Sequence, residues 1–182
     1  MQEVLMDPQA LGPAIHYYMI RGGTAKRNIT IWETGTVGGE YIKTYGHYHL
    51  GNLDETYECI AGEGIALLQK MVVENGATVS DRIEEFRAVR IKAGDSVYMP
   101  PGYGHLVVNI GKQWLVTSDN SPVAGPDDSA SMPGHADYEV VKQMQGFAFY
   151  VVERDGVPAL VKNPRYTEIQ KTDSGGLALL DA

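Results

Sequence analysis

The segment Gly94–Asn109 reads Gly-Asp-Ser-Val-Tyr-Met-Pro-Pro-Gly-Tyr-Gly-His-Leu-Val-Val-Asn and is the most specific stretch of the chain. Its two apolar runs, Ser96–Met99 and His105–Asn109, have the length of short strands. The residues between them, Pro100–Gly104, are rich in proline and glycine, which favour turns. The segment therefore predicts two strands joined by a turn, with His105 opening the second strand.

The chain on either side repeats this rhythm of short strands and turns. The 21 glycines suit tight turns better than long helices. Many short strands with turn signals between them predict an all-β sandwich or barrel. The expected strands are Ile15–Ile20, Asn28–Thr34, Tyr41–Leu50, Thr56–Ile60, Ile65–Val72, Arg82–Ile91, Ser96–Met99, His105–Asn109 and Gln113–Ser118, with a later pair at Phe147–Glu153 and Ala159–Lys162.

One region departs from the strand pattern. Residues 122–134 hold proline, glycine, aspartate and serine, and we expect a loop there. In the following residues, 135–144, the side chains of Val140, Val141 and Met144 share a helical face, which predicts a short helix packed outside the barrel. No linker divides the chain, so residues 1–182 are expected to form a single domain with N- and C-terminal arms.

Composition narrows the classes of function. A formal charge of -8 argues against a nucleic-acid or anionic-membrane surface, and no apolar run is long enough to cross a bilayer. The first residues lack the pattern of a secretion signal, so a cytoplasmic location is expected. The single cysteine, Cys59, excludes an intrachain disulfide and predicts a buried thiol.

Three of the five histidines and one glutamate form a candidate metal site: His47, His49, Glu55 and His105. Residues two apart on a strand point to the same face, so His47 and His49 can both reach the interior. Three neutral imidazoles and a carboxylate suit Fe(II), Mn(II), Ni(II) or Zn(II). The sequence therefore predicts one divalent metal ion.

The spacing of these residues resembles the cupin motifs. Gly94, Pro100, Gly102, His105 and Asn109 occupy every fixed position of the second cupin motif. The first motif is matched by the His-x-His pair, the glutamate and a later glycine, although its spacer of five residues exceeds the usual three or four. The resemblance implies a cupin fold, which is a double-stranded β-helix or jelly-roll barrel.

A narrower resemblance accounts for the unusual spacer. The run Gly38–His49 reads Gly-Gly-Glu-Tyr-Ile-Lys-Thr-Tyr-Gly-His-Tyr-His, and it is followed by Glu55-Thr56-Tyr57 and Gly62. This pattern resembles the cupin-type glucose-6-phosphate isomerases of archaea and some bacteria. The resemblance covers residues 28–111, about the central half of the chain.

The resemblance implies a reaction and a role for each matched residue. It implies interconversion of glucose 6-phosphate and fructose 6-phosphate with one metal ion per subunit, Fe²⁺ first and Mn²⁺, Ni²⁺ or Zn²⁺ as alternatives. Strand alternation places Lys43 opposite Thr44, so Lys43 receives no phosphate role. The implied metal ligands are His47, His49, Glu55 and His105; the implied catalytic residues are Glu55, Tyr57 and His135; the implied substrate contacts are Thr30, Thr44, Gly46, Tyr57 and Tyr138.

Alternatives remain open at this level. An Fe(II)-dependent cupin dioxygenase uses the same ligand set, and a non-catalytic sugar-phosphate-binding cupin would keep the site without turnover. Within the isomerase, Glu55 can carry a proton between two carbons, or a hydride can shift directly. We expect a homodimer using the strand with Tyr17 and Tyr18, and residues 172–182 as a frayed tail or an arm on a partner. A monomer at all concentrations in light scattering would refute the dimer.

Overall fold

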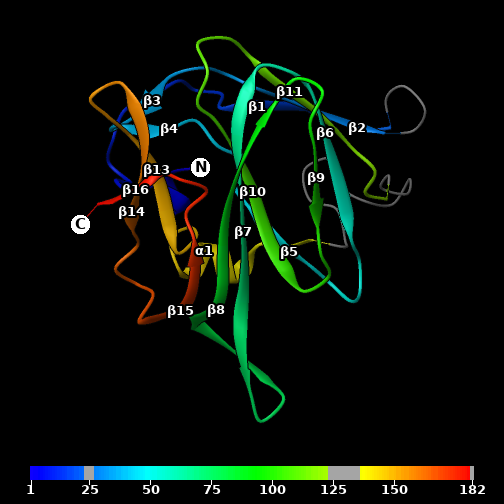
Figure 1. Ribbon diagram of the computed structural model, residues 1–182, viewed down its shortest axis with the longest axis vertical. Coiled ribbons are helices and arrows are strands. Elements are labelled where there is room, and N and C mark those ends of the chain that lie inside the picture. The colour runs from blue at the N-terminus through cyan, green and yellow to red at the C-terminus, as the bar shows by residue number, and fades with distance from the viewer. Residues whose placement is uncertain (23–26, 123–135, 181–182) are drawn as a thin grey trace.

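The computed structural model describes residues 1–22, 27–122 and 136–180, and in them the chain folds into three β-sheets (Figure 1). The first sheet has the order β1 (Tyr17–Ile20), β2 (Asn28–Trp32), β11 (Leu115–Asp119), β6 (Glu55–Ala61) and β9 (Ser96–Met99). The second has the order β12 (Ala136–Asp137), β5 (His47–His49), β10 (Tyr103–Asn109), β7 (Glu63–Glu74), β8 (Ala77–Lys92) and β15 (Glu168–Asp173). The third has the order β16 (Ala178–Leu180), β14 (Val157–Lys162), β13 (Phe149–Arg154), β4 (Glu40–Tyr41) and β3 (Thr36–Val37).

The second sheet lies between two hydrophobic cores because its strands are apolar on both faces. On β10, Val107 belongs to the core shared with the first sheet, whereas Leu106 and Val108 belong to the core shared with the third sheet. We call these the inner core and the outer core. Alternation along β10 therefore assigns His105, two residues before Val107, to the inner side.

The expected all-β, cupin-like fold is confirmed, although the described strands form three sheets and not a closed barrel. Most of the predicted strands are present. The short helix α1 (Glu139–Gln143) falls inside the expected range. Its Val141 is fully buried in the outer core, and the chain leaves the helix through Gly146 at φ +112°. A second short element, the 3₁₀-helix η1 (Gln2–Val4), precedes β1. In the described part of the chain, no helix has both the length and the apolar character needed to cross a membrane.

One expected strand was wrong, and so was one of the two alternatives for the C-terminal segment. The expected strand Tyr41–Leu50 is interrupted: only β4 and β5 are strands, with an isolated bridge at Lys43 between them. The interruption runs from Ile42 to Gly46, and the φ of Gly46, +84°, lies outside the range of a strand. The C-terminal segment is not a frayed tail in its described part, because β15 pairs in parallel with β8 and β16 pairs in parallel with β14.

Candidate metal centre

The four candidate ligands meet between the first and second sheets. His47, His49, Glu55 and His105 each offer one ligand atom, and these atoms all lie within 4.8 Å of one another. The imidazole rings of His47 and His105 are 4.5 Å apart between centroids, and those of His49 and His105 are 5.0 Å apart. The structure therefore brings together residues that are up to 58 positions apart in the sequence.

Strand pairing explains how these side chains reach one point. β5 pairs antiparallel with β10, with His47 opposite His105 in the register. On β5 the intervening Tyr48 packs into the outer core, so His47 and His49 face the inner side. Glu55 reaches the same point from β6 of the first sheet, where it is opposite Met99 of β9. Two facing sheets thus supply the imidazoles and the carboxylate respectively.

Burial determines the protonation of the central pair. Burial lowers the pKa of His105 to about 4, so the imidazole is neutral at pH 7. Burial, followed by the nearby carboxylate of Asp119, raises the pKa of Glu55 to about 9. The 2.9 Å contact between His105 Nε2 and Glu55 Oε2 is therefore not an ion pair in the metal-free protein.

The same two atoms fit a metal ion. His105 Nε2 and Glu55 Oε2 are buried, and in the described ranges they have no hydrogen-bond partner beyond their contact with each other and the 3.4 Å contact of Oε2 with His49 Nε2. Buried polar atoms without partners are costly, and a cation between them would remove that cost. A neutral imidazole is also the form that binds metal, and a divalent cation would favour the ionised carboxylate of Glu55. The group can hold one metal ion.

A buried network behind β5 holds Tyr48 in place. The side-chain amide of Gln69, which is fully buried, donates to Tyr48 Oη at 2.7 Å and to Tyr166 Oη at 3.0 Å, and it accepts from the Ala148 N–H at 2.8 Å. Gly104 lies opposite Tyr48 in the β5–β10 register, and its missing side chain leaves room for the tyrosine ring. This network fixes the position of the strand that carries two of the imidazoles.

We expect Gly104→Ala to weaken metal binding without unfolding the protein. The new Cβ would lie 2.6 Å from Cζ of Tyr48, so the ring and β5 must move. Such overpacking costs about 1–3 kcal/mol of unfolding free energy. Displaced supporting residues typically weaken a metal site about 10–100-fold. Metal titration would measure this loss.

The matched control for this substitution is Gly111→Ala. Gly111 follows the other end of β10, and there the new Cβ would first meet the flexible side chain of Glu63 at 3.1 Å. Equal metal affinity in Gly104→Ala and the wild type would contradict the proposed role of the glycine.

Two of the expected substrate residues have rings next to the imidazoles of the four-ligand group, and two others are known by their burial and hydrogen bonds. The ring of Tyr57 is 5.6 Å from that of His105, and the ring of Tyr138 is 5.3 Å from that of His47. Thr30 is buried on β2. Thr44 is half-buried, and its hydroxyl accepts a hydrogen bond from the Val107 N–H at 3.1 Å. The prediction for His135 lies outside the described residues.

The sequence reasoning missed a buried polar cluster beside Glu55. Asp119 Oδ1 accepts hydrogen bonds from Asn28 Nδ2 at 2.9 Å, from Ser121 Oγ at 2.7 Å and from the Ser121 N–H at 3.1 Å. All three residues are at most 8% exposed. The available signal was strand alternation, because Leu115, Thr117 and Asp119 share the inner face of β11.

Facing β-sheets with three imidazoles and a carboxylate between them define a cupin that can hold a metal ion. The model of the family described as "Glucose-6-phosphate isomerase (GPI)" matches residues 16–168 of this chain. The glucose-6-phosphate isomerase of Pyrococcus furiosus is 32% identical over 139 residues, and that of Thermococcus kodakarensis is 32% identical over 140 residues. The chain belongs to the cupin-type glucose-6-phosphate isomerase family.

These matches cover only part of the length of the relatives. The two alignments cover 75% and 76% of this chain but only 62% and 63% of the relatives, so the chain spans about three fifths of their length. Among solved structures, the oxalate decarboxylase of Bacillus subtilis aligns with a TM-score of 0.38 and 21% identity, covering 57% of this chain and 24% of that protein.

Proposed function

We propose that this protein is a metal-dependent glucose-6-phosphate isomerase that interconverts glucose 6-phosphate and fructose 6-phosphate. The observation that carries the proposal is the convergence of His47, His49, Glu55 and His105 in a chain of this family. The proposal makes the protein an aldose–ketose isomerase of glycolysis and gluconeogenesis. A location in the cytoplasm is part of the same proposal.

His47, His49, Glu55 and His105 would hold one divalent ion, which we propose is Fe²⁺, with Mn²⁺, Ni²⁺ or Zn²⁺ as substitutes. Three imidazoles and a carboxylate suit each of these metals. When bound, the ion would polarise the sugar carbonyl and stabilise the negative charge that develops on the neighbouring oxygens.

Glu55 is the proposed proton carrier of the isomerisation. Its carboxylate would take the proton from C2 of the open-chain aldose, the C–H electron pair would form the C1–C2 double bond, and the carbonyl π pair would move onto O1. The hydroxyl proton of O2 would then pass to O1, and Glu55 would return the first proton to C1 as the ketose carbonyl forms at C2. Glu55 suits this task because it is 2% exposed and lies at the centre of the four-ligand group, so bulk water does not compete for the proton.

The other site residues would bind and orient the sugar phosphate. Tyr57 and Tyr138 flank the imidazoles and would contact the sugar chain. Thr30, Thr44 and the backbone N–H of Gly46 would receive the phosphate, since hydroxyl and N–H donors bind phosphate oxygens. His135, from the sequence resemblance, would act beside them.

We also propose that the protein is a homodimer that binds neither nucleic acid nor membrane. Strand β1 is at the edge of its sheet and carries the exposed side chains of Tyr18, Met19 and Ile20. An exposed apolar edge strand favours pairing with another chain.

The direct test of the proposed function is the conversion of fructose 6-phosphate to glucose 6-phosphate by the metal-loaded protein. Turnover that disappears when the metal is removed would support the proposal. A metal-loaded protein that converts neither sugar phosphate would refute it. Oxygen uptake with a small organic substrate would instead identify the dioxygenase alternative.

A further inference from the structure

A cavity of about 500 Å³ has Tyr138 in its wall, and the ring of Tyr138 packs against the candidate ligand His47. Its walls include Tyr17 and Met19 of β1, and also Tyr45 and Tyr138. Tyr138 connects the cavity to the group, because its ring lies 5.3 Å from the imidazole of His47 and 5.7 Å from the ring of Tyr45. Tyr138 therefore belongs both to the wall of the cavity and to the surroundings of His47.

The cavity also adjoins the proposed phosphate contacts. Met19 is opposite Thr30 in the pairing of β1 with β2, and Tyr45 is the residue between Thr44 and Gly46. Met19 and Tyr45 therefore both line this cavity, and each is a neighbour of a proposed phosphate contact.

Arg21 supplies positive charge to this cavity. Among the described residues that line it, Arg21 is the one with a permanently cationic side chain. Tyr17 and Tyr138 line the same cavity as Arg21. The charge of Arg21 also opposes the rise that burial gives to the pKa of Tyr17.

A phosphate dianion needs such a cation here. The carboxyl groups of Glu55 and Asp119 lie near each other between the first and second sheets. The whole chain carries a formal charge of -8. Hydroxyl and backbone donors alone would leave the dianion close to acidic groups. A guanidinium binds phosphate through two parallel hydrogen bonds and adds the missing positive charge.

We propose that Arg21 binds the phosphate group of the substrate in this cavity and is the residue that selects phosphorylated over unphosphorylated sugars. The inference rests on the proposed function, whose substrate is a sugar phosphate. It adds a charged contact to the hydroxyl and N–H donors named above.

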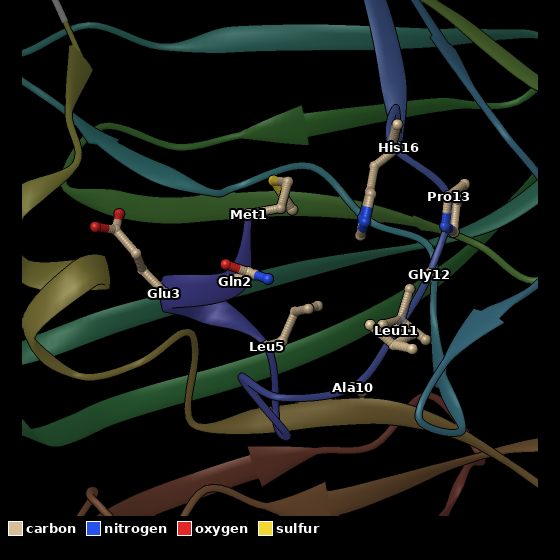
Figure 2. Close-up of a pocket in the computed structure, with 11 residues that line it drawn as sticks. Met1, Gln2, Glu3, Leu5, Ala10, Leu11, Gly12, Pro13 and His16 are labelled. Carbon is tan, nitrogen blue, oxygen red and sulfur yellow. The ribbon is translucent and has the colours of Figure 1, made fainter.

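Two other cavities of similar size are less suited to this ligand. The cavity of about 420 Å³ in Figure 2 lies between η1 and the chain leading into β1, with His16 directed toward it and the acidic Glu3 in its wall. A cavity of about 590 Å³ is lined by Arg90, Lys92 and Lys112. It adjoins Glu63, at the end of the β7–β10 pairing remote from His105.

The test is equilibrium binding to the metal-loaded protein by calorimetry, with fructose 6-phosphate, fructose and inorganic phosphate as ligands. We expect Arg21→Gln to weaken binding of fructose 6-phosphate and of phosphate by about 10–100-fold, the usual size of a lost hydrogen bond to a charged group. Fructose binding and metal content should not change. Arg21→Lys keeps a point charge but loses the two parallel hydrogen bonds, so it should recover only part of the loss.

Arg90→Gln is the matched control, because it removes the same charge from the wall of the remote cavity. Unchanged phosphate binding in Arg21→Gln would overturn the proposal, as would phosphate binding that falls in Arg90→Gln but not in Arg21→Gln. Because binding is measured without turnover, a wild-type protein that binds fructose 6-phosphate through Arg21 but does not isomerise it would reject the proposed reaction and leave this inference standing.

Discussion

Replacing Glu55 by glutamine is expected to lower kcat at least about 10³-fold, within the range that a positioned acid–base group contributes. Glutamine keeps the size of the side chain and one oxygen that can still face the metal, but it cannot accept a proton. Turnover should therefore fall while KM changes little. The measurement is steady-state kinetics of fructose 6-phosphate conversion, with the metal content of each preparation determined in parallel.

Asp54→Asn is the matched control, because it removes the carboxylate of the residue that directly precedes Glu55. Asp54 is exposed and accepts a hydrogen bond from Tyr98 Oη at 3.0 Å, away from the four-ligand group. This variant should retain wild-type turnover. Full activity in Glu55→Gln with metal still bound would show that Glu55 is not the base, and it would favour the direct hydride shift.

Lys43→Met is expected to cost about 3–5 kcal/mol of unfolding free energy, the usual cost of removing one partner from a buried ion pair. Lys43 Nζ lies 2.5 Å from Glu40 Oε1 and donates to the Val4 carbonyl at 2.6 Å. The two charged side chains are 4% and 1% exposed, so the remaining carboxylate of Glu40 would be buried without its counter-charge. Urea unfolding monitored by fluorescence would measure the loss.

The double variant Glu40→Leu, Lys43→Met separates the stranded charge from the loss of packing. Removing both charges should recover much of the stability, although Glu40 Oε2 also accepts the Met6 N–H at 2.7 Å, and that bond is lost. A single Lys43→Met variant within 1 kcal/mol of the wild type would show that the pair contributes little net stability.

The lysine also shows where sequence reasoning stopped. Strand alternation gave Lys43 no phosphate role, but the strand it assumed is interrupted between β4 and β5. The residue is instead held in a buried pair that connects the N-terminal segment to β4. The partner carbonyl of Val4 is 39 residues away, and no local pattern indicates such a contact.

The four-ligand group was predictable because one pair of ligands is local and the other two stand at motif spacing. His47 and His49 follow from alternation on one strand, and motif spacing indicated Glu55 and His105. The supporting residues were not predictable in this way. Gln69 and Gly104 act through Tyr48, and this role depends on the pairing of β5 with β10 and on the packing of the third sheet.

The same limit applies to the charged cavity. Arg21 follows β1 in a glycine-rich turn, where an arginine usually faces solvent. Its place beside Tyr45 and Tyr138 arises only when three separate segments fold together. Roles that depend on such non-local contacts require the structure, whereas roles encoded by spacing within a strand do not.

The most direct test of the central claim is to remove all metal from the protein and restore Fe(II), Mn(II), Ni(II) and Zn(II) one at a time. Conversion of fructose 6-phosphate to glucose 6-phosphate is then followed in a coupled assay. We expect no turnover in the protein without metal, recovery of turnover with at least one of the four metals, and one bound ion per chain. Tight binding of one ion with no turnover for any of the four metals would contradict it.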